Sequence, residues 1–236
     1  SAELSEVFII DHSTTTKEAT GHSGGRWGKG GDFLYRWGNP QNYRQGDSTD
    51  RQTFYQHDFR WIEKGYPGEG SFTLFNDGIP GTERKDSLAY SGVYQIKPTV
   101  DNNGNYVLMN NKRFGPEQPE WKYIAKDTIS LYAPFVSGAQ RMKNGDTFIT
   151  EGPKGRMFEV TPEGEIVWEY LNPYHGDIRY LDGDPKQVQR YPYFVWRAHF
   201  VPADHPGLKG KVLTPLDPQP EVFKLPPKEE EKEKSE

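Results

Sequence analysis

Short runs of apolar and aromatic residues recur along this chain, and Gly, Asn, Asp or Pro bounds each run. Alternation of apolar and polar positions over roughly four to eight residues is typical of half-buried β-strands. It predicts strands at Glu6–Ile10, Asp32–Trp37, His57–Ile62, Ser71–Asn76, Gly92–Ile96, Tyr106–Met109, Ser137–Met142, Asp146–Thr150, Arg156–Val160, Glu165–Tyr170 and Phe194–Val201. The fold class predicted from this pattern is all-β.

One strand pattern occurs twice. A turn glycine, an acidic residue, an alternating aromatic and aliphatic run and an Asn-Pro pair begin at Gly31 and again at Gly164, 133 residues later. This spacing divides into three units of about 44 residues, the length of a four-stranded propeller blade. We therefore predict a β-propeller with four-stranded blades, of which the chain covers about three.

The repeat divides the chain into five parts. These are a half blade with a long Gly-rich insertion (1–55), two blades (56–132 and 133–180), a partial closing blade (181–225) and a disordered charged tail (226–236). Two blades and two partial blades cannot close a ring, because propellers have at least about four blades. We expect the remaining blades to come from a second polypeptide or from another copy of this chain.

Composition narrows the classes of function. The 25 Gly and 19 Pro favour turns over helices, and a net charge of −5 argues against nucleic-acid partners, which need a basic face. The absence of Cys excludes disulfides and thiolate metal sites. No apolar run reaches the roughly 18 residues of a membrane-spanning helix.

The strongest candidate for chemistry is the segment Tyr55-Gln56-His57-Asp58, at the expected start of an inner strand. Such a junction points side chains into the channel mouth of a propeller. His57 is suited to act as a nucleophile, as a general base or as a cation that binds an oxyanion, since imidazole changes charge near neutral pH. The alternative is a His and an Asp that only hold a loop in place.

Other candidates are basic residues. His22 lies in a glycine-dense insertion whose backbone can approach an anion closely, which would make it part of an anion site. The alternative is a flexible hairpin with incidental charges. Period-2 alternation puts Arg197 and His199 on one face of a strand, as an anion site or as ordinary polar residues. Arg84 follows an Asn-Asp-Gly turn and is either an anion ligand or a surface arginine. No HxH or HExxH spacing occurs, so no metal is assigned. A propeller with a quinone cofactor is a further alternative, but the sequence shows no repeated tryptophan docking motifs and no calcium-binding carboxylates, and no cofactor is assigned.

Several of these phrases resemble the bacterial aryl sulfotransferase family. The similarity covers roughly residues 5–202 and corresponds to the C-terminal half of that family's propeller. It rests on Phe8–Thr15, Gly28–Pro40, Gln56–Asp58, Leu74–Gly78 and Phe158–Tyr170.

The resemblance implies a six-bladed propeller that is periplasmic or secreted by a bacterium. It implies transfer of a sulfuryl group from a phenolic sulfate ester to a phenol, without a nucleotide, through a sulfohistidine. His57 would then be catalytic, and Gln56, Asp58, Arg84 and Arg197 would bind the substrate. Binding of a related anionic aromatic ligand would also fit this resemblance. A binding or structural assembly module without catalytic activity is the alternative.

The chain departs from the family at one position. The family's sulfate-accepting histidine corresponds to the region of Ser137 and Gly138, where this sequence has no histidine. His199, His22 or a residue outside this chain would take its place, or the activity is different or lost.

Overall fold

The computed structural model describes residues 1–81, 89–128, 130–174, 191, 193–215 and 217. Within these residues ten strands form antiparallel sheets, and the only α-helix is the single turn Thr16–Ala19 (α1). The short 3-10 helices of the connections are Pro40–Tyr43, Ser48–Asp50, Gly152–Lys154 and Pro206–Leu208. The all-β prediction is confirmed.

The first sheet has two strands, β1 (Val7–Ile10) and β2 (Phe33–Trp37), with Val7 opposite Trp37. The Gly-rich insertion between them folds on itself around α1. Thr15 caps this helix and exchanges hydrogen bonds with Glu18. Gly31 closes the insertion so near the Ala19 carbonyl that a side chain there would collide with it.

Each of the next two sheets is a four-stranded antiparallel meander. The second follows the order β3 (His57–Trp61), β4 (Phe72–Ile79), β5 (Tyr90–Ile96) and β6 (Trp121–Ile124). The third consists in chain order of β7 (Gly138–Arg141), β8 (Thr147–Glu151), β9 (Arg156–Val160) and β10 (Ile166–Leu171). The two copies of the repeated pattern thus form β2 and β10, the last strands of the first and third sheets.

The prediction of a strand at Tyr106–Met109 is wrong. This segment makes only isolated β-bridges, and the fourth strand of the second sheet is β6. The rings of Tyr106 and Phe114 each lie 5.4 Å from the ring of Tyr35 on β2. The apolar residues of this excursion therefore complete the core of the neighbouring sheet, which alternation alone cannot distinguish from a strand in the ladder.

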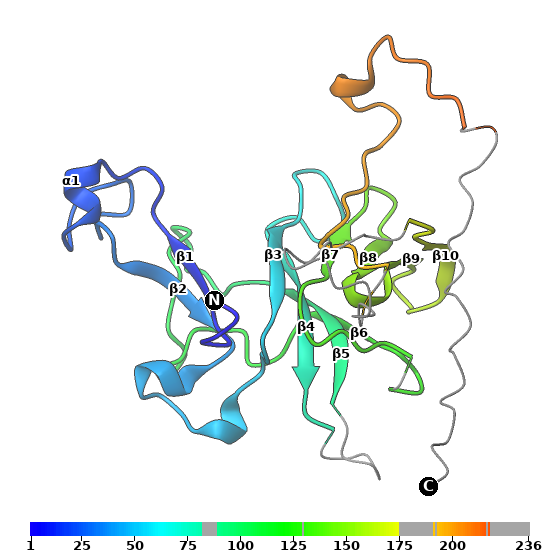
Figure 1. Cartoon of the computed structure of the whole chain (residues 1–236). Coiled ribbons are helices and arrows are strands. Elements are labelled where there is room, and N and C mark those ends of the chain that lie inside the picture. Colours follow the sequence, from blue (N-terminus) through cyan, green and yellow to red (C-terminus); the bar gives the residue numbers. More distant parts are fainter. Residues whose placement is uncertain (82–88, 129, 175–190, 192, 216, 218–236) are drawn as a thin grey trace, which may run out of the picture.

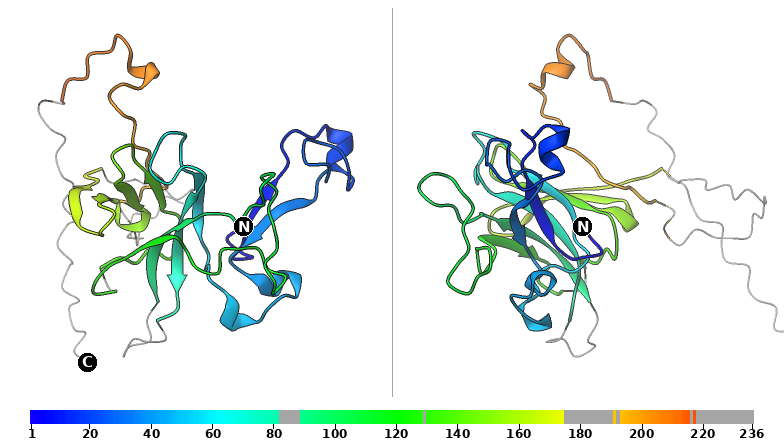
Figure 2. Two further views of the ribbon diagram at one scale, coloured as in Figure 1. Left: turned by 180° about the vertical axis from the view of Figure 1, so that it is seen from behind. Right: turned by 90° about the vertical axis from the view of Figure 1, so that its left-hand side faces the viewer.

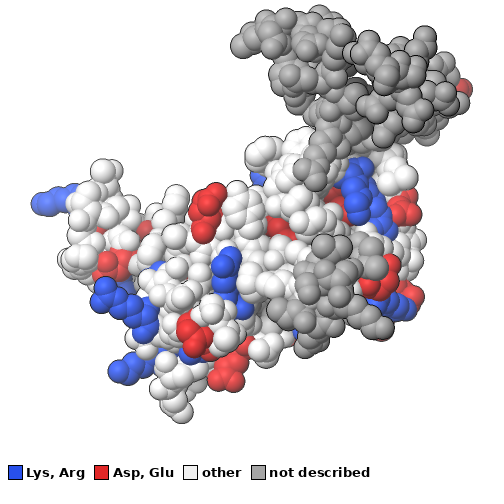
Figure 3. Space-filling view, turned by 60° about the horizontal axis from the view of Figure 1, so that its bottom comes forward, with Lys and Arg blue, Asp and Glu red and all other residues white. Residues whose placement is uncertain are grey.

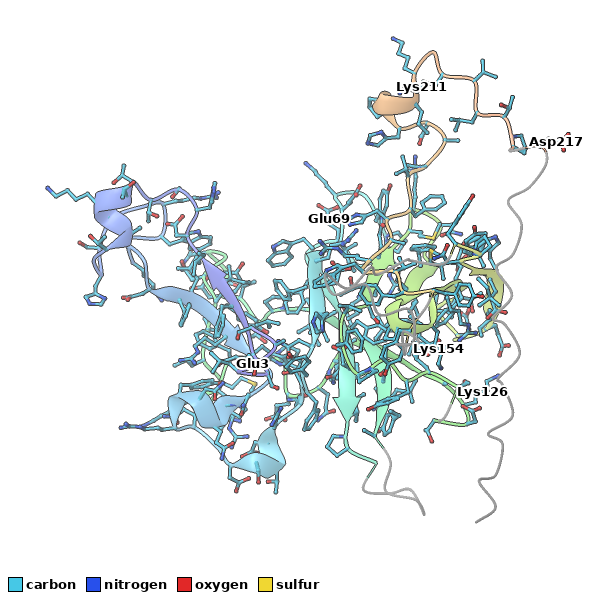
Figure 4. All side chains as sticks on the ribbon, viewed as in Figure 1. Glu3, Glu69, Lys126, Lys154, Lys211 and Asp217 are labelled. Carbon is cyan, nitrogen blue, oxygen red and sulfur yellow. The ribbon has the colours of Figure 1, made fainter. Side chains whose placement is uncertain are left out.

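The three sheets lie side by side (Figure 1, Figure 2), and side chains pack between neighbouring sheets (Figure 4). Between the first two sheets the core includes Tyr35, Trp37, Phe72 and Leu74. Between the second and third sheets it includes Phe75, Val93, Ile149 and Phe158. Both faces of the second sheet are buried in this way, which accounts for the nearly continuous burial of β4 and β5.

The prediction of a strand at Phe194–Val201 is also wrong. The segment runs beside β7 and β8 and is held by isolated hydrogen bonds. One of them runs from the Val195 amide to the Gly152 carbonyl at 2.9 Å. The Phe200 amide donates a hydrogen bond to Gln140 Oε1 at 3.0 Å, and Gln140 Nε2 donates to the Phe200 carbonyl at 3.3 Å. These contacts have no ladder register, so the segment packs on the third sheet without adding a strand to it.

After Pro202 the described chain extends away from the sheets, and Lys211 and Asp217 lie far from them (Figure 4). Most of residues 181–192 and the tail 226–236 lie outside the described residues. In the described part of the chain, no helix has both the length and the apolar character needed to cross a membrane. On the face seen in Figure 3, acidic and basic side chains are interspersed.

Candidate functional site

His57 and Asp77 form a hydrogen-bonded pair across two neighbouring strands. His57 begins β3 opposite Phe75, and Asp77 lies two residues further along β4, where the pairing with β5 is irregular. The distance from His57 Nδ1 to Asp77 Oδ2 is 2.8 Å. The Asp77 side chain is fully buried, whereas a quarter of the His57 side chain is exposed. A buried carboxylate thus orients an imidazole that reaches the surface.

Burial dominates the electrostatics of this pair. It raises the pKa of Asp77 to about 7, and the hydrogen bond and charge of His57 offset only part of this effect. Burial is the largest single effect and lowers the pKa of His57. The hydrogen bond to Asp77 and its charge, the backbone of Tyr55 and the charge of Asp58 together outweigh burial, so that the pKa of His57 is raised. The two groups titrate as a unit. With the Asp77 carboxylate as acceptor, Nδ1 carries the proton.

Replacing Asp77 by asparagine is expected to lower the pKa of His57, because burial remains and the carboxylate is lost. In the wild type, the raised pKa stabilises the fold below pH 6.5, and this contribution is lost as the pH rises through the folded-state value. NMR titration of the imidazole protons checks the shift, with the His22 resonance as internal reference. An unchanged His57 midpoint would show that Asp77 does not set it.

An open depression of about 320 Å³ lies between β1 and β3, and His57 lines it. The backbone is strained there, since Tyr55 and Asp58 have φ angles of 58° and 51°. The Tyr55 ring stands edge-on to the imidazole at 5.6 Å. The other lining residues are Ser1, Ala2, Val7, Phe8, Gln56, Asp58 and Phe59. The depression therefore offers aromatic and aliphatic walls beside a titratable nitrogen.

A second cluster forms around Asp58, whose side chain is 4% exposed. Asp58 Oδ1 accepts hydrogen bonds from Arg60 Nη2 at 3.2 Å and from Arg197 Nη1 at 3.0 Å. Asp58 Oδ2 accepts from the Ala139 amide at 3.2 Å. Arg60 Nη1 also lies 3.1 Å from His199 Nδ1. The structure therefore brings Asp58, Arg197 and His199 together, although the segment that carries Arg197 and His199 is not the predicted strand.

Gly138 explains how the carboxylate of Asp58 fits between the two sheets. A Cβ atom at Gly138 would collide with Asp58 Oδ2. This is the region in which the resemblance to aryl sulfotransferases would place a histidine. In this chain the buried carboxylate fills the space that a side chain at Gly138 would need.

The remaining predicted residues lie elsewhere. The Gln56 side chain is buried and donates hydrogen bonds to the carbonyls of Ser1 and Glu6 at 3.0 and 3.1 Å. It therefore joins the segment before β1 to the segment before β3. His22 lies on the Gly-rich insertion, where Nδ1 is 2.7 Å from Asp32 Oδ1 and the ring is largely exposed. The insertion stands apart from β3 (Figure 1). Arg84 lies outside the described residues.

Two residues of the site are absent from the sequence-based prediction. Asp77 belongs to the Asn-Asp-Gly segment, which is interpreted there as a turn but continues β4 to Ile79. Arg60 shares with Asp58 one face of the predicted strand, and this alternation was the available signal. The pairing partners of β3 and β4 were needed to recognise both residues.

Comparison with known proteins gives no matching family model and no significant match among curated proteins. Among the residues that the structure describes, no group of three His, Asp or Glu side chains has the arrangement of a metal site. The site is therefore interpreted from its own geometry: one imidazole–carboxylate pair and one cationic cluster.

Proposed function

We propose that this chain is part of a β-propeller that binds an aromatic sulfate ester and transfers its sulfuryl group to a phenol, with His57 as the acid and base. The observation that carries the proposal is the His57–Asp77 pair at the edge of an open depression. An imidazole oriented by a buried carboxylate exchanges protons near neutral pH. The aromatic walls of the depression suit an aryl ring.

The proposed reaction needs two proton transfers. When the S–O bond of the donor ester breaks, protonated His57 gives its proton to the leaving phenolate oxygen. The neutral imidazole then takes the proton of the acceptor phenol as the phenol oxygen attacks the sulfur. A nucleophile forms a bond to the sulfur as the donor S–O bond breaks, and this bond breaks when the acceptor oxygen attacks. His199 suits this role better than His22, because it lies beside Arg60, whose charge stabilises the transferring oxygens.

The proposal includes a ring larger than this chain. The two four-stranded antiparallel sheets support this part of the proposal, and a six-bladed propeller would need further blades from a second polypeptide or another copy. Resemblance to bacterial aryl sulfotransferases supports a periplasmic or secreted location. Residue ranges 56–132 and 133–180 would correspond to two of the blades.

The test is turnover of 4-nitrophenyl sulfate by the native particle, with and without an added phenol. We expect release of 4-nitrophenolate that increases with the phenol and a matching amount of the new sulfate ester. Release that is independent of the acceptor would indicate a sulfatase instead. The absence of release with several phenols would contradict the proposed transfer.

A non-catalytic assembly module is the second candidate, and the exposed face of β10 favours it. This edge strand exposes five large apolar or aromatic side chains: Ile166 (47%), Val167 (56%), Trp168 (45%), Tyr170 (41%) and Leu171 (63%). An edge strand with exposed apolar side chains is a template for association. Native mass spectrometry of the purified particle distinguishes the candidates. A second polypeptide of comparable size fits a split propeller, and self-association without turnover fits the assembly module.

A further inference from the structure

A cavity of about 230 Å³ lies beside the end of β2. The 3-10 helices Pro40–Tyr43 and Ser48–Asp50 line one part of it, and residues 109–118 line another. It shares no lining residue with the depression at His57. Its chemistry is therefore separate from that of the proposed sulfuryl transfer.

An ion pair joins the two parts of this cavity. Arg113 Nη1 and Nη2 donate to Asp50 Oδ1 and Oδ2 at 2.5 and 2.8 Å, in two parallel hydrogen bonds. Arg113 Nε also donates to the Gln45 carbonyl, and the Asp47 amide donates to Asp50 Oδ2 at 3.0 Å. Each side chain of the pair is 27% exposed. Both groups are thus held in place before a ligand binds, which lowers the entropic cost of binding.

The charges of this pair cancel. The hydrogen bond from Arg113 lowers the pKa of Asp50, so the carboxyl group is ionised at neutral pH. The other charged residue of the lining is Glu117, and it is exposed to water. The lining therefore has no excess positive charge that would attract an anion.

Hydrogen-bonding positions of both kinds stay open at the cavity. A guanidinium has five N–H donors and a carboxylate has about four acceptor positions, and the contacts of the pair use three of each. Gln52 Nε2 donates to the Glu117 carbonyl at 2.8 Å, which leaves Oε1 as an acceptor. Asn111 Oδ1 accepts from the Arg113 amide at 3.0 Å, which leaves Nδ2 as a donor. Donors and acceptors are therefore both available to a ligand.

We propose that this cavity binds a neutral saccharide ring, with Asp50 and Arg113 as its principal partners. Each sugar hydroxyl donates one hydrogen bond and accepts others, so two neighbouring hydroxyls match a donor and an acceptor held side by side. The C–H groups of a sugar ring are apolar, and Met109 and Phe114 supply apolar lining for them. Apolar walls with a few fixed polar groups are typical of small-molecule sites.

The test uses the methyl glycosides of glucose, galactose and mannose, which carry no charge. Binding of one of them to the full chain should shift the Trp37 indole N–H and Met109 methyl resonances in NMR spectra, since both residues line the cavity. Asp50→Asn should weaken this binding at least about tenfold, the usual effect of losing a hydrogen bond to a charged group. Asp204→Asn makes the same change at an exposed position after Pro202 and should leave binding unchanged.

A second variant leaves the ion pair in place. Gln118 is exposed and lines the cavity, so Gln118→Trp should fill part of it and abolish binding even if Asp50→Asn does not fold. The site is refuted if no glycoside shifts the two reporter resonances, or if both variants bind as the wild type does. If acetamide shifts them and no glycoside does, the saccharide assignment is overturned. His57→Ala should retain glycoside binding whatever its turnover, so a failure of the proposed transfer does not imitate a failure of this site.

Discussion

Replacing His57 by alanine is expected to lower acceptor-dependent turnover of 4-nitrophenyl sulfate about 10²- to 10⁴-fold, the usual contribution of a positioned acid or base. The fold should tolerate the change. The imidazole is partly exposed, and burial raises the pKa of Asp77 to about 7, so that this carboxyl group can take up a proton when its partner is removed. Rates measured on the native particle check the prediction, with amide NMR spectra to confirm the fold.

Matched variants make this result specific. His205→Ala removes a histidine that caps the 3-10 helix Pro206–Leu208, remote from the depression, and should retain full turnover. His57→Gln retains a polar group but cannot transfer a proton at neutral pH, and should be as inactive as His57→Ala. Wild-type turnover in a folded His57→Ala variant would remove the basis of the proposed chemistry.

Replacing Glu6 by alanine is expected to destabilise the fold by about 3–5 kcal/mol, the usual effect of removing one partner of a buried ion pair. The Glu6 side chain is fully buried. Its carboxylate accepts from Arg36 Nε and Nη2 at 2.6 and 2.9 Å and from Asn42 Nδ2 at 2.8 Å. Its loss would leave the guanidinium, 21% exposed, without its charge partner. The free energy of unfolding, measured by urea denaturation, checks the prediction.

Two further variants identify the cause of this loss. Glu63→Ala removes an exposed carboxylate on the turn after β3 and should change stability by no more than about 0.5 kcal/mol. Glu6→Gln keeps the shape and one acceptor oxygen, and should lie between the wild type and Glu6→Ala. A loss below about 1 kcal/mol for Glu6→Ala would mean that water replaces the carboxylate around Arg36.

The sequence predicted most of the strands because alternation is a local property. Each confirmed strand is a short apolar or alternating run between turn residues. The two wrong predictions, Tyr106–Met109 and Phe194–Val201, are runs of the same kind. Tyr106 packs on Tyr35, and Phe200 packs on Phe148 at 6.4 Å, so both segments place aromatic rings against a sheet without joining a ladder.

The candidate site was predictable only in part. The predicted strand that groups Arg197 with His199 does not form, but Arg197 contacts Asp58 and His199 lies beside Arg60. The sequence gives no reason to prefer Asp58 over Asp77 as the partner of His57. Asp77 reaches the imidazole because β4 runs antiparallel to β3, and the pairing of strands depends on contacts far apart in the chain.

By itself, the sequence determined that this protein is all-β, where most strands lie and which residue types are available for acid, base and anion chemistry. These properties follow from local periodicity and side-chain chemistry. Only the tertiary structure decided that Asp77 is buried against His57, that Gly138 leaves room for the Asp58 carboxylate and that two arginines share it. Burial and charge pairing depend on which sheets pack together, because they are set by distances in space rather than along the chain.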